Sequence, residues 1–566
     1  MIEPLALSTI EKGLRRKGTE PAGDLAWLKD SYENPSGFWT SLAAALDLFL
    51  PWPRKSIPFE KYNFFHDIVV RNRMSAAPAF RWYQAGSGWR EASFPELGAF
   101  AGAMAAHWAK TGVEAGSKVC LVYPMGIRFA ASLLAALKLG AVVSILPPEG
   151  RGFLNRRLET LEPDYIAIEQ IHLSLIPQWL GRVIGEEKGG RPSDGVMEGS
   201  FTYTAGSPVA MLFDPSSEDL LTPRELTADA GYLCALRDGL LALGLRPGSA
   251  FAAPGFDLLG CQPAMLLACL LTGATYVHLE LEQIAHDPGL VGAHPLRAIG
   301  VSARVRNILL DNPVDLSQSW TLWLREIAET YDLELWQSFA ESMGLTGLDC
   351  GNLRWNPSLG GCILFSIRRT GLPTMNVLPS AGVSWELSGD LAGDAGSAMG
   401  AGVFSPVSIG GGAPETVLTS DLIVERRGEW MYAGSLAPGR CGRVYPAPEV
   451  VEAVRTMPQC RRVAIVDNRA MGGMGRLFTL LIFSGDQPPA DQAGICKAME
   501  RAVTREMGEQ YLPDHIRFFP LYPRRDKKGE IDGEWCRSQY MKGGLSRKSR
   551  GEVYRCLTRL RRYLND

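Results

Sequence analysis

A nine-residue loop at positions 214–222 has the composition that bears most directly on chemistry. It follows a short buried strand at 208–213 and carries the carboxylates Asp214, Glu218 and Asp219. A loop that holds phosphate uses backbone N–H groups, glycines that let the chain approach, and a lysine that neutralises charge. This loop contains no glycine and no lysine, and its carboxylates repel an anion. The composition of this loop therefore disfavours the binding of an anion.

The cysteines show no spacing that indicates a metal site or a covalent mechanism. Eleven cysteines include no Cys-x-x-Cys pair, so neither a zinc site nor a disulfide framework is predicted. No Ser/His/Asp or Cys/His arrangement can be identified from spacing. Cys261 and Cys269 lie on a predicted buried helix and are interpreted as core thiols. An odd number of cysteines fits a reducing cytosol.

Length and composition are those of a globular protein with more than one domain. A chain of 566 residues, 46% hydrophobic and 21% charged, is too long for a single core. The net charge of −3 gives no reason to expect a nucleic-acid partner. No apolar run has the length of a membrane span, and the N-terminus lacks the apolar core of a signal peptide. We predict a cytoplasmic protein.

Residues 79–148 contain predicted core elements that indicate the fold class. Ser93 and Glu96 form a predicted capping box at the start of a helix. Two buried strands, at 119–123 and 141–146, flank a helix at 129–139. A strand–helix–strand unit of this kind belongs to a parallel sheet covered by helices. The predicted fold class is therefore α/β.

The segment 419–449 predicts a junction between two domains. Its first part alternates apolar and polar residues around positions 426–428, as a hairpin does. Residues 433–439 are small and include a proline, so no regular element continues through them. A helix begins after Pro446. Its apolar face is formed by Val450, Val451, Val454 and Met457.

The order of these motifs resembles the domain junction of adenylate-forming enzymes, the superfamily of acyl-CoA and acetyl-CoA synthetases, peptide-synthetase adenylation domains and luciferases. The resemblance rests on Thr-x-Asp at 419–421, the hairpin, the hinge and Gly-Arg-Val-x-Pro at 442–446, and residues 79–148 are also close to an acyl-CoA synthetase. It implies a large N-terminal domain of helix-covered parallel sheets with a small β-barrel-like subdomain. This large domain would be hinged to a small α+β C-terminal lid.

The implied domains are four segments of the chain. An aromatic-rich N-terminal strap covers residues 1–70, and the large domain covers 71–434. The lid covers 435–535, and a basic tail follows at 536–566. A short amphipathic helix is predicted in the tail from Glu552. The tail could dock onto a partner subunit, an acidic carrier protein or a phosphorylated ligand, or fold back on the lid.

Several residues stand where active members of this superfamily hold their nucleotide. Asp421 takes the place of an aspartate that grips the ribose hydroxyls, although a turn also favours aspartate. Phe339 takes the place of an aromatic ring that stacks on adenine. Glu341 takes the place of a magnesium ligand, and its alternative is a strand-end or helix-capping carboxylate. No other metal ligand is predicted.

Three contacts to ATP in the resembled superfamily are altered here. The phosphate loop is replaced by residues that include Asp214, Pro215, Ser216, Ser217, Glu218, Asp219 and Thr222. Ser435 stands where a hinge arginine reaches phosphate, and Glu530 stands where a lysine bridges carboxylate and ATP. Lys527 or Lys528 could be re-registered into the site as a catalytic lysine. Each change removes positive charge or anion-binding backbone.

The motifs favour an acyl-CoA synthetase-like protein that has lost ordinary ATP-dependent adenylation. It would act as a non-catalytic partner or scaffold, or bind an acyl, CoA or carrier-protein ligand without a required cofactor. The alternative is a divergent ligase that joins an acid to a thiol or amine through an acyl-adenylate, with ATP, Mg²⁺ and CoA. A third possibility is an acyltransferase that keeps only the thioester chemistry. Whether the chain is an enzyme stays open at this point.

Overall fold

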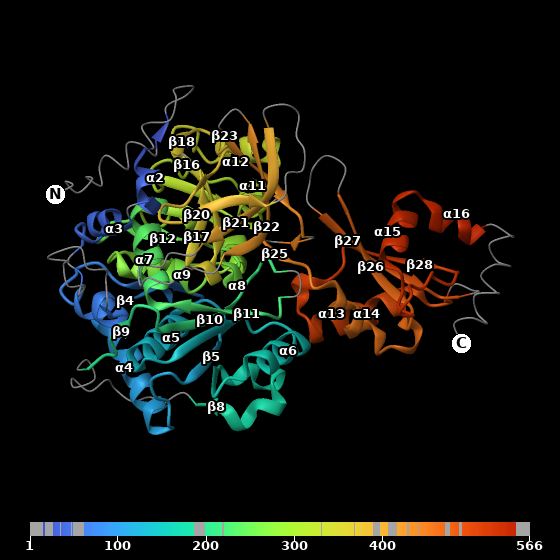
Figure 1. Cartoon of the computed structure of the whole chain (residues 1–566), viewed down its shortest axis with the longest axis horizontal. Coiled ribbons are helices and arrows are strands. Elements are labelled where there is room, and N and C mark those ends of the chain that lie inside the picture. The colour runs from blue at the N-terminus through green and yellow to red at the C-terminus, as the bar shows by residue number, and fades with distance from the viewer. Residues whose placement is uncertain are drawn as a thin grey trace.

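A computed structural model shows a large body joined to a smaller C-terminal unit (Figure 1). It describes residues 15–16, 26–33, 35–46, 48, 61–185, 199–217, 220–329, 331–366, 368–388, 397–405, 416–426, 429–437, 439–440, 442–469, 476–485 and 489–550. The predicted tail helix from Glu552 lies outside these residues. So do Glu218 and Asp219 of the loop at 214–222, which is called the acidic loop below. No helix in the described part of the chain has both the length and the apolar character needed to span a bilayer.

The first sheet of the large body has six strands in the order β11-β10-β6-β5-β7-β8. They are β5 (Lys118–Val122), β6 (Val142–Leu146), β7 (Tyr165–Ile168), β8 (Val183–Ile184), β10 (Pro208–Phe213) and β11 (Pro223–Thr227). β11 runs antiparallel to β10, and the other pairs are parallel. Helix α5 (Ile127–Leu139) packs on β5 and β6 and ends at Gly140, whose φ of 79° suits glycine. The predicted strand–helix–strand unit is confirmed.

The second sheet has the order β1-β18-β16-β15-β14-β12-β13-β3-β4, with β17 beside β16 and β19 beside β17. Its strands are β1 (Arg15–Arg16), β3 (Phe80–Gln84), β4 (Gly88–Ala92), β12 (Ala250–Ala252), β13 (Thr275–His278), β14 (Ala298–Gly300), β15 (Leu322–Glu326), β16 (Asp349–Asn356), β17 (Gly361–Phe365), β18 (Arg368–Thr370) and β19 (Leu378–Pro379). The pairs from β3 to β16 through β13, β12, β14 and β15 are parallel. This sheet places the ends of β14, β15 and β16 side by side, where the site described below is built.

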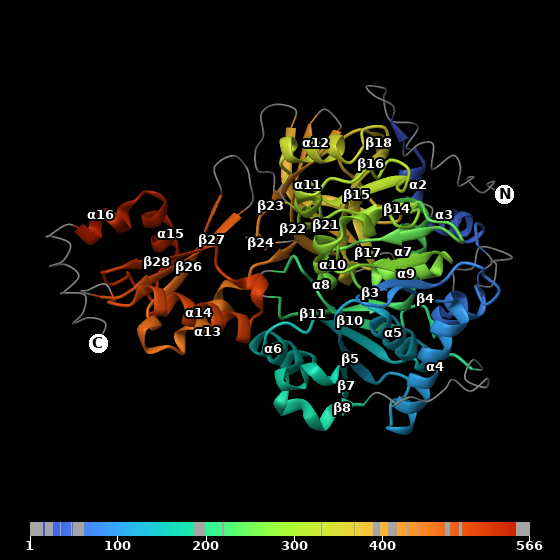
Figure 2. The ribbon, with the colours of Figure 1, turned by 180° about the vertical axis from the view of Figure 1, so that it is seen from behind.

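Helices cover both sheets, as views from opposite sides show (Figures 1 and 2). They are α4 (Phe94–Lys110), α6 (Arg151–Leu161), α7 (Ala228–Arg237), α8 (Leu258–Cys261), α9 (Ala264–Leu271), α10 (Leu281–His286), α11 (Ala303–Asp311) and α12 (Leu333–Ser342). The predicted capping box is present at α4, where the Ser93 hydroxyl accepts from the Glu96 N–H and Glu96 accepts from Ser93. One hydrophobic core joins both sheets with α5, α7 and α9.

The N-terminal segment is attached to this core through its aromatic side chains. The described elements are α2 (Ala26–Glu33), α3 (Pro35–Ala43), β2 (Lys61–Tyr62) and a π-helical turn at His66–Val70. β2 pairs with β9 (Tyr203–Thr204), far along the chain. Trp39, Tyr62 and Phe65 have no exposed surface and belong to the main core. Aromatic residues here pack onto the larger body, as their density predicts.

A third, antiparallel sheet completes the large body. Its strands are β20 (Ser384–Ser388), β21 (Ser397–Ser405), β22 (Val417–Arg426) and β23 (Glu429–Ser435), paired in chain order. The β22–β23 pair is the hairpin predicted around 426–428. Among the described strands β20 and β23 do not pair, so the unit is an open sheet and the predicted barrel-like closure is not seen.

The C-terminal unit, called the lid below, begins after two short strands, β24 (Gly439–Arg440) and β25 (Arg443–Val444). It contains β26 (Val463–Arg469), β27 (Arg476–Phe483), β28 (His515–Phe519), α13 (Ala447–Arg455), α14 (Gln492–Glu506), α15 (Gly533–Met541) and α16 (Gly544–Arg550). The predicted helix after Pro446 is α13, and Val450 and Val454 on its apolar face are fully buried. The large body plus small α+β lid agrees with the predicted fold class.

Candidate functional site

The main cleft has a volume of about 640 Å³ and lies where the three sheets and the lid meet. Its lining comes from the acidic loop, the first turn of α11, the segment after β15, strands β22 and β23, and the lid. Ser216, Glu329 and Ser435 represent three of these segments. Segments that are far apart in the sequence, including the predicted loop and hinge, therefore converge on one site.

In the acidic loop, backbone N–H groups donate hydrogen bonds to Asp214 of the same loop. Asp214 is 3% exposed, and its Oδ1 accepts hydrogen bonds from the N–H of Ser216 at 2.8 Å, the Ser216 hydroxyl at 2.6 Å and the Asn356 amide at 3.1 Å. The Ser217 N–H donates to the Asp214 carbonyl. Pro215 is buried, and Thr222 is exposed. The N–H groups of Ser216 and Ser217 are therefore already bonded within the loop, and a carboxylate stands beside them.

Asp421 is satisfied within the protein. It has no exposed surface, and both carboxylate oxygens accept from Nε of Arg354, at 2.9 and 3.1 Å. The Tyr432 hydroxyl donates to Oδ1 at 3.0 Å. The neighbouring Ser420 and Leu422 line the cleft, whereas Asp421 does not. To hold a ribose, Asp421 would have to replace its hydrogen bonds from Arg354 and Tyr432 with hydrogen bonds from the ribose hydroxyls.

Phe339 and Glu341 do not lie where the resemblance puts them, and this corrects both predictions. They belong to helix α12, because Trp336, Phe339 and Ala340 recur at helical spacing and form its buried face. Phe339 has no exposed surface and packs edge-on against Trp323 and Trp336, so its ring cannot stack on a base. Glu341 accepts from the Gln337 amide on the solvent side of the helix, outside the cleft.

Two carboxylates that the sequence did not reveal lie in this region instead. Glu326 ends β15, and Glu329 follows it and lines the main cleft. The Glu329 Oε2 accepts from the Ala303 N–H at 2.7 Å, at the start of α11. Burial raises the pKa of both carboxyl groups to about 7. No local sequence pattern reveals Glu326 and Glu329, because the residues that bond to them are distant in the sequence. Examples are Trp355 for Glu326 and Ala303 for Glu329.

Six arginines line the cleft, and most of them are engaged. They are Arg304, Arg306, Arg354, Arg440, Arg443 and Arg476. Arg306 is 5% exposed and lies over the Trp336 ring, and its Nη1 atom is buried without a hydrogen-bond partner. Arg304 is exposed at the same turn of α11. The cleft therefore keeps cationic character on the α11 side, away from the acidic loop.

The lid lysines and Glu530 lie outside the cleft. Lys527 and Lys528 are exposed in a turn bridged by Arg525 and Ile531, and neither lines the cleft. Glu530 is exposed and lies 3.5 Å from Arg455 on the same unit. In this arrangement the structure does not bring the candidate lysines to Asp421.

Ser435 lies in the cleft wall at the end of β23. Its hydroxyl donates to the Ser420 hydroxyl at 2.9 Å, and its carbonyl accepts from the Arg476 guanidinium at 2.9 Å. Arg476 belongs to β27 of the lid and also pairs with Asp467 at 3.0 Å. A cation therefore reaches the predicted hinge from the lid, although the hinge itself carries none.

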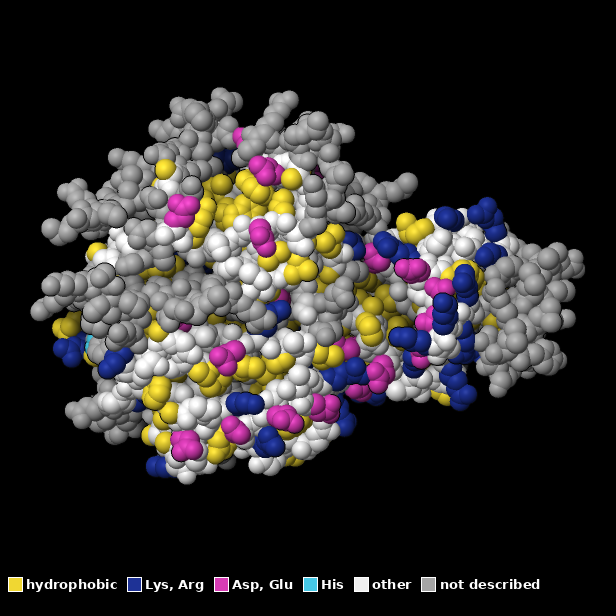
Figure 3. Space-filling model, viewed as in Figure 1, with side chains coloured by type: hydrophobic (Ala, Val, Ile, Leu, Met, Phe, Trp, Pro, Cys, Tyr) yellow, Lys and Arg dark blue, Asp and Glu magenta, His cyan; other side chains and the backbone are white. Residues whose placement is uncertain are grey.

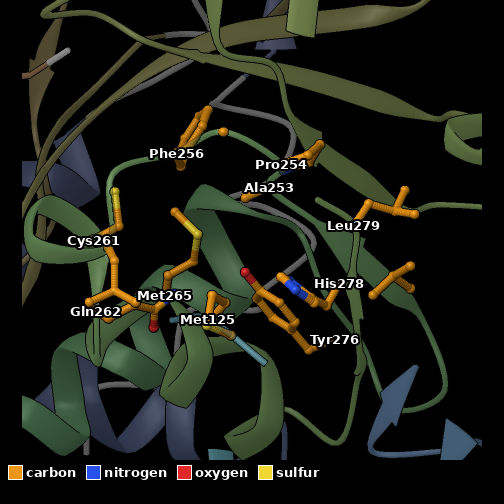
Figure 4. Close-up of a pocket in the computed structure, with 13 residues that line it drawn as sticks. Met125, Ala253, Pro254, Phe256, Cys261, Gln262, Met265, Tyr276, His278 and Leu279 are labelled. Atoms are coloured by element: carbon orange, nitrogen blue, oxygen red, sulfur yellow. The ribbon is translucent and has the colours of Figure 1, made fainter. Parts of the chain in front are cut away.

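A smaller pocket of about 60 Å³ lies deeper in the large body (Figure 4). It is lined by Met125, Ala253, Pro254, Gly255, Phe256, Leu258, Cys261, Gln262, Met265, Tyr276, Val277, His278 and Leu279. A constriction of about 10 Å³ shares Phe256 and Cys261 with the pocket, and shares Glu329 and Arg354 with the main cleft. The three hollows are therefore neighbours in series, from the main cleft through the constriction to the buried pocket.

Cys261 lines this constriction, whereas Cys269 is enclosed in α9. Burial raises the pKa of both thiols, so neither is a thiolate at neutral pH. The interpretation as core thiols fits both residues, since both belong to the main hydrophobic core, and Cys261 also forms part of the pocket wall.

The lid is held against the large body by buried ion pairs. Arg443 donates to Glu149, Asp257 and the Tyr511 hydroxyl, with distances of 2.5–3.0 Å. Arg157 of α6 pairs with Glu449 of α13. A second hydrophobic core is continuous across the same boundary. Its members from the large body include Phe153 and Leu158, and those from the lid include Val454, Met507 and Tyr511.

The residues of the acidic loop that the structure describes do not fit a bound triphosphate. In the described part of the chain no group of three or more His, Cys, Asp or Glu side chains is arranged to hold a metal ion. The acidic loop offers a carboxylate where an anion requires donors.

Comparison with known proteins gives matches in structure only. No family model matches the chain, and no curated protein sequence matches it. Acetoacetyl-CoA synthetase from Streptomyces lividans superposes with a TM-score of 0.58 at 15% identity, covering 91% of this chain and 90% of that one. NpsA-ThdA, an artificially fused adenylation–PCP di-domain from Klebsiella oxytoca, superposes with a TM-score of 0.60 at 13% identity, covering 80% of this chain and 92% of that one. The chain therefore shares the fold of these two solved structures, an acyl-CoA synthetase and an adenylation–PCP di-domain.

Proposed function

We propose that the protein is a non-adenylating, acyl-CoA synthetase-like subunit that binds an acyl or acyl-thioester ligand. The ligand would lie along the series of hollows, with its acyl end in the buried pocket. The observation that carries the proposal is Asp214, whose carboxylate holds the Ser216 N–H and the Asn356 amide where a phosphate would need donors. An anion would have to displace this carboxylate and would be repelled by it.

The attachment of the lid supports the same proposal. Arg157 and Glu449 are almost fully buried, with side-chain exposures of 0% and 4%, and the core beneath them is continuous with the lid. Moving the lid as a rigid unit would break this buried ion pair and expose the shared hydrophobic core to water. A lid that stays docked suits a binding protein better than an enzyme that reorganises its domains between reaction steps.

Calorimetric titration of the full chain tests this proposal. Mg-ATP is expected to give no heat of binding up to millimolar concentrations, whereas CoA or an acyl-CoA is expected to bind. Pyrophosphate release with a panel of carboxylic acids should stay at the level of the buffer. Mg-ATP binding in the micromolar range, with pyrophosphate release, would overturn the proposal in favour of an active enzyme.

The second candidate is a divergent active ligase that uses ATP, Mg²⁺ and CoA. One observation favours it. Arg306 has an unpaired buried Nη1 atom, and Arg304 lies exposed beside it on the cleft. A nucleotide could place its phosphates against α11 instead of the acidic loop. Loss of Mg-ATP binding in an Arg306→Met variant, starting from a wild type that binds, would support this candidate.

The lid also has a surface suited to an acidic protein partner such as a carrier protein. Residues 443–566 contain 23 Lys and Arg against 15 Asp and Glu, a charge of +8, so residues 1–442 carry −11. Figure 3 shows Lys and Arg side chains gathered over the lid. Exposed members are Lys497, Arg501, Arg505, Arg524, Arg525, Lys527, Lys528, Arg537, Lys542 and Arg547. Association with an acidic carrier protein should weaken with salt and with charge reversal at Lys527 and Lys528.

A further inference from the structure

The buried pocket contains polar groups for which the protein provides no partner. Tyr276 and Gln262 are 3% and 4% exposed, and both line the pocket. Gln262 Oε1 accepts a hydrogen bond from the Leu266 N–H at 3.1 Å, so the Nε2 group of Gln262 is the donor that still requires a partner. Among the residues that the structure describes, nothing forms a hydrogen bond with this Nε2, with the Tyr276 hydroxyl or with the His278 ring.

These groups face one small space. Figure 4 shows the Tyr276 hydroxyl and the His278 ring on the same side of the pocket, with Met265 and Met125 beside them. Buried polar side chains in proteins are nearly always hydrogen-bonded, to protein, water or ligand. Two polar side chains buried to this extent around a single cavity therefore indicate that something else supplies the missing hydrogen bonds.

The lining also restricts the charge of an occupant. No Lys, Arg, Asp or Glu lines the pocket. Burial lowers the pKa of His278 to about 4, so its ring is neutral at pH 7 and can both donate and accept. A charged group placed here would lose its hydration without gaining a counter-ion. An uncharged hydroxyl, carbonyl or amide meets the available partners.

Size gives the third restriction. A volume of about 60 Å³, measured as the space open to the centres of water molecules, has room for only a handful of non-hydrogen atoms, since about 10–15 Å³ of this measure holds one water. The walls are closed by large side chains such as Met265, Phe256 and Leu279. A long alkyl chain cannot enter unless these residues move.

We infer that the pocket selects a short acyl group that ends in an uncharged hydrogen-bonding atom, and that Tyr276 and His278 are the specificity-determining residues. This inference rests on the proposed function, because it assumes that the acyl end of the ligand enters the pocket through the constriction at Phe256 and Cys261. It excludes fatty acyl chains and short diacids as the preferred ligands.

The test is a titration of the full chain with five acids, followed by ligand-observed NMR. The probes are butanoate, 3-hydroxybutanoate, 4-hydroxybutanoate, succinate and octanoate. At least one hydroxy acid should bind about fivefold to tenfold more tightly than butanoate, the gain expected from one well-formed hydrogen bond. Succinate and octanoate should bind more weakly than butanoate.

Variants assign the selectivity to the pocket. Tyr276→Phe should remove most of the preference for the hydroxy acid and leave the butanoate affinity unchanged. His278→Asn should also reduce the preference, and provides a second route if one substitution disturbs folding. Tyr83→Phe, on strand β3 of the same sheet, does not line the pocket and should leave the whole series unchanged.

Two failures can be told apart. Equal binding of butanoate, octanoate and the hydroxy acids would overturn the inference and leave acyl binding in place. No binding of any acid, together with no binding of an acyl-CoA, would remove the proposed function and the inference with it. A preference that survives Tyr276→Phe and His278→Asn unchanged would also overturn the assignment of these two residues.

Discussion

Arg157 on α6 and Glu449 on α13 form a bidentate ion pair across the boundary between the large body and the lid, with both N–O distances 3.0 Å. Arg157 also donates to the Phe153 carbonyl and lies over the Phe153 ring, 3.6 Å from its centre. The pair is removed from water, so each charge depends on the other. The boundary therefore behaves as protein interior, not as an open hinge.

Breaking this pair from one side should destabilise the docked lid. Glu449→Gln leaves Arg157 buried without a counter-ion, and we expect a loss of about 3–5 kcal/mol in unfolding free energy. Urea denaturation monitored by tryptophan fluorescence measures it. Glu452→Gln, at the partly exposed pair with Arg156, is the matched control and should cost at most about 1 kcal/mol. Equal, small effects in both variants would show that the lid is not docked in this way in solution.

Gly150 provides a steric test of the same boundary. A Cβ atom built on Gly150 would lie 2.2 Å from the backbone of Glu506 and Met507 at the end of α14. Its φ is −77°, so alanine introduces a clash without backbone strain. We expect Gly150→Ala to loosen the lid, with faster hydrogen exchange in α13 and α14 and increased proteolysis near 435–445. Gly181→Ala, which meets nothing within 4 Å, should leave exchange unchanged.

Asp214 should contribute to stability rather than to ligand binding. Asp214→Ala removes the acceptor for the Ser216 N–H and hydroxyl and for the Asn356 amide, all of which are buried. We expect a loss of about 1–3 kcal/mol in unfolding free energy and no gain of Mg-ATP binding. Thr222→Ala, at the exposed end of the loop, should change stability by less than about 0.5 kcal/mol. A stable Asp214→Ala variant that binds Mg-ATP would show that this carboxylate alone blocks the site.

Much of the architecture could be predicted because it depends on local pattern. The capping box at Ser93 and Glu96, the buried strand 208–213 and the valine face of α13 depend on residues within a few positions of one another. The hairpin around 426–428 was predicted for the same reason. Motif order then placed these elements in a known fold.

The site could be predicted less well because its contacts are long-range. Glu326 and Glu329 acquire raised pKa values from burial against α11 and β16, which no local pattern shows. The segment around Phe339 matched a nucleotide motif in residue type, but its aromatic residues are spaced to form the buried face of a helix. Asp421 was identified from its motif, whereas its pairing with Arg354 depends on a long-range contact between β16 of the second sheet and β22 of the third.

The raised pKa of Glu329 predicts a pH dependence of stability. In the folded protein its pKa is about 7, against 4.5 for the unperturbed group, so the folded state binds the proton more tightly than the unfolded state. The favourable contribution is complete below pH 4.5 and is lost as the pH rises through 7. Glu329→Gln removes this dependence but keeps an acceptor for the Ala303 N–H.

Unfolding free energies measured between pH 4.5 and 8 should therefore show wild type losing stability relative to Glu329→Gln. The expected relative change is on the order of 2 kcal/mol, reduced from the full shift because the side chain is partly exposed. Glu334→Gln, at an exposed carboxylate in the first turn of α12, should run parallel to wild type. Parallel curves for Glu329→Gln and wild type would mean that Glu329 titrates normally.

The hydroxyls of Tyr276 and Tyr232 give a last prediction that does not depend on any ligand. Both side chains are buried, but the Tyr232 hydroxyl donates to the Asp67 carboxylate, whereas Tyr276 has no hydrogen bond to a described residue. Tyr232→Phe removes the hydrogen bond that the Tyr232 hydroxyl donates to the buried Asp67 carboxylate. It should lower the unfolding free energy by about 1–3 kcal/mol. Tyr276→Phe removes only an unpaired hydroxyl and should change the unfolding free energy by less than about 0.5 kcal/mol, or raise it. If Tyr276→Phe costs as much as Tyr232→Phe in ligand-free protein, the Tyr276 hydroxyl has an internal partner and is not held ready for an acyl group.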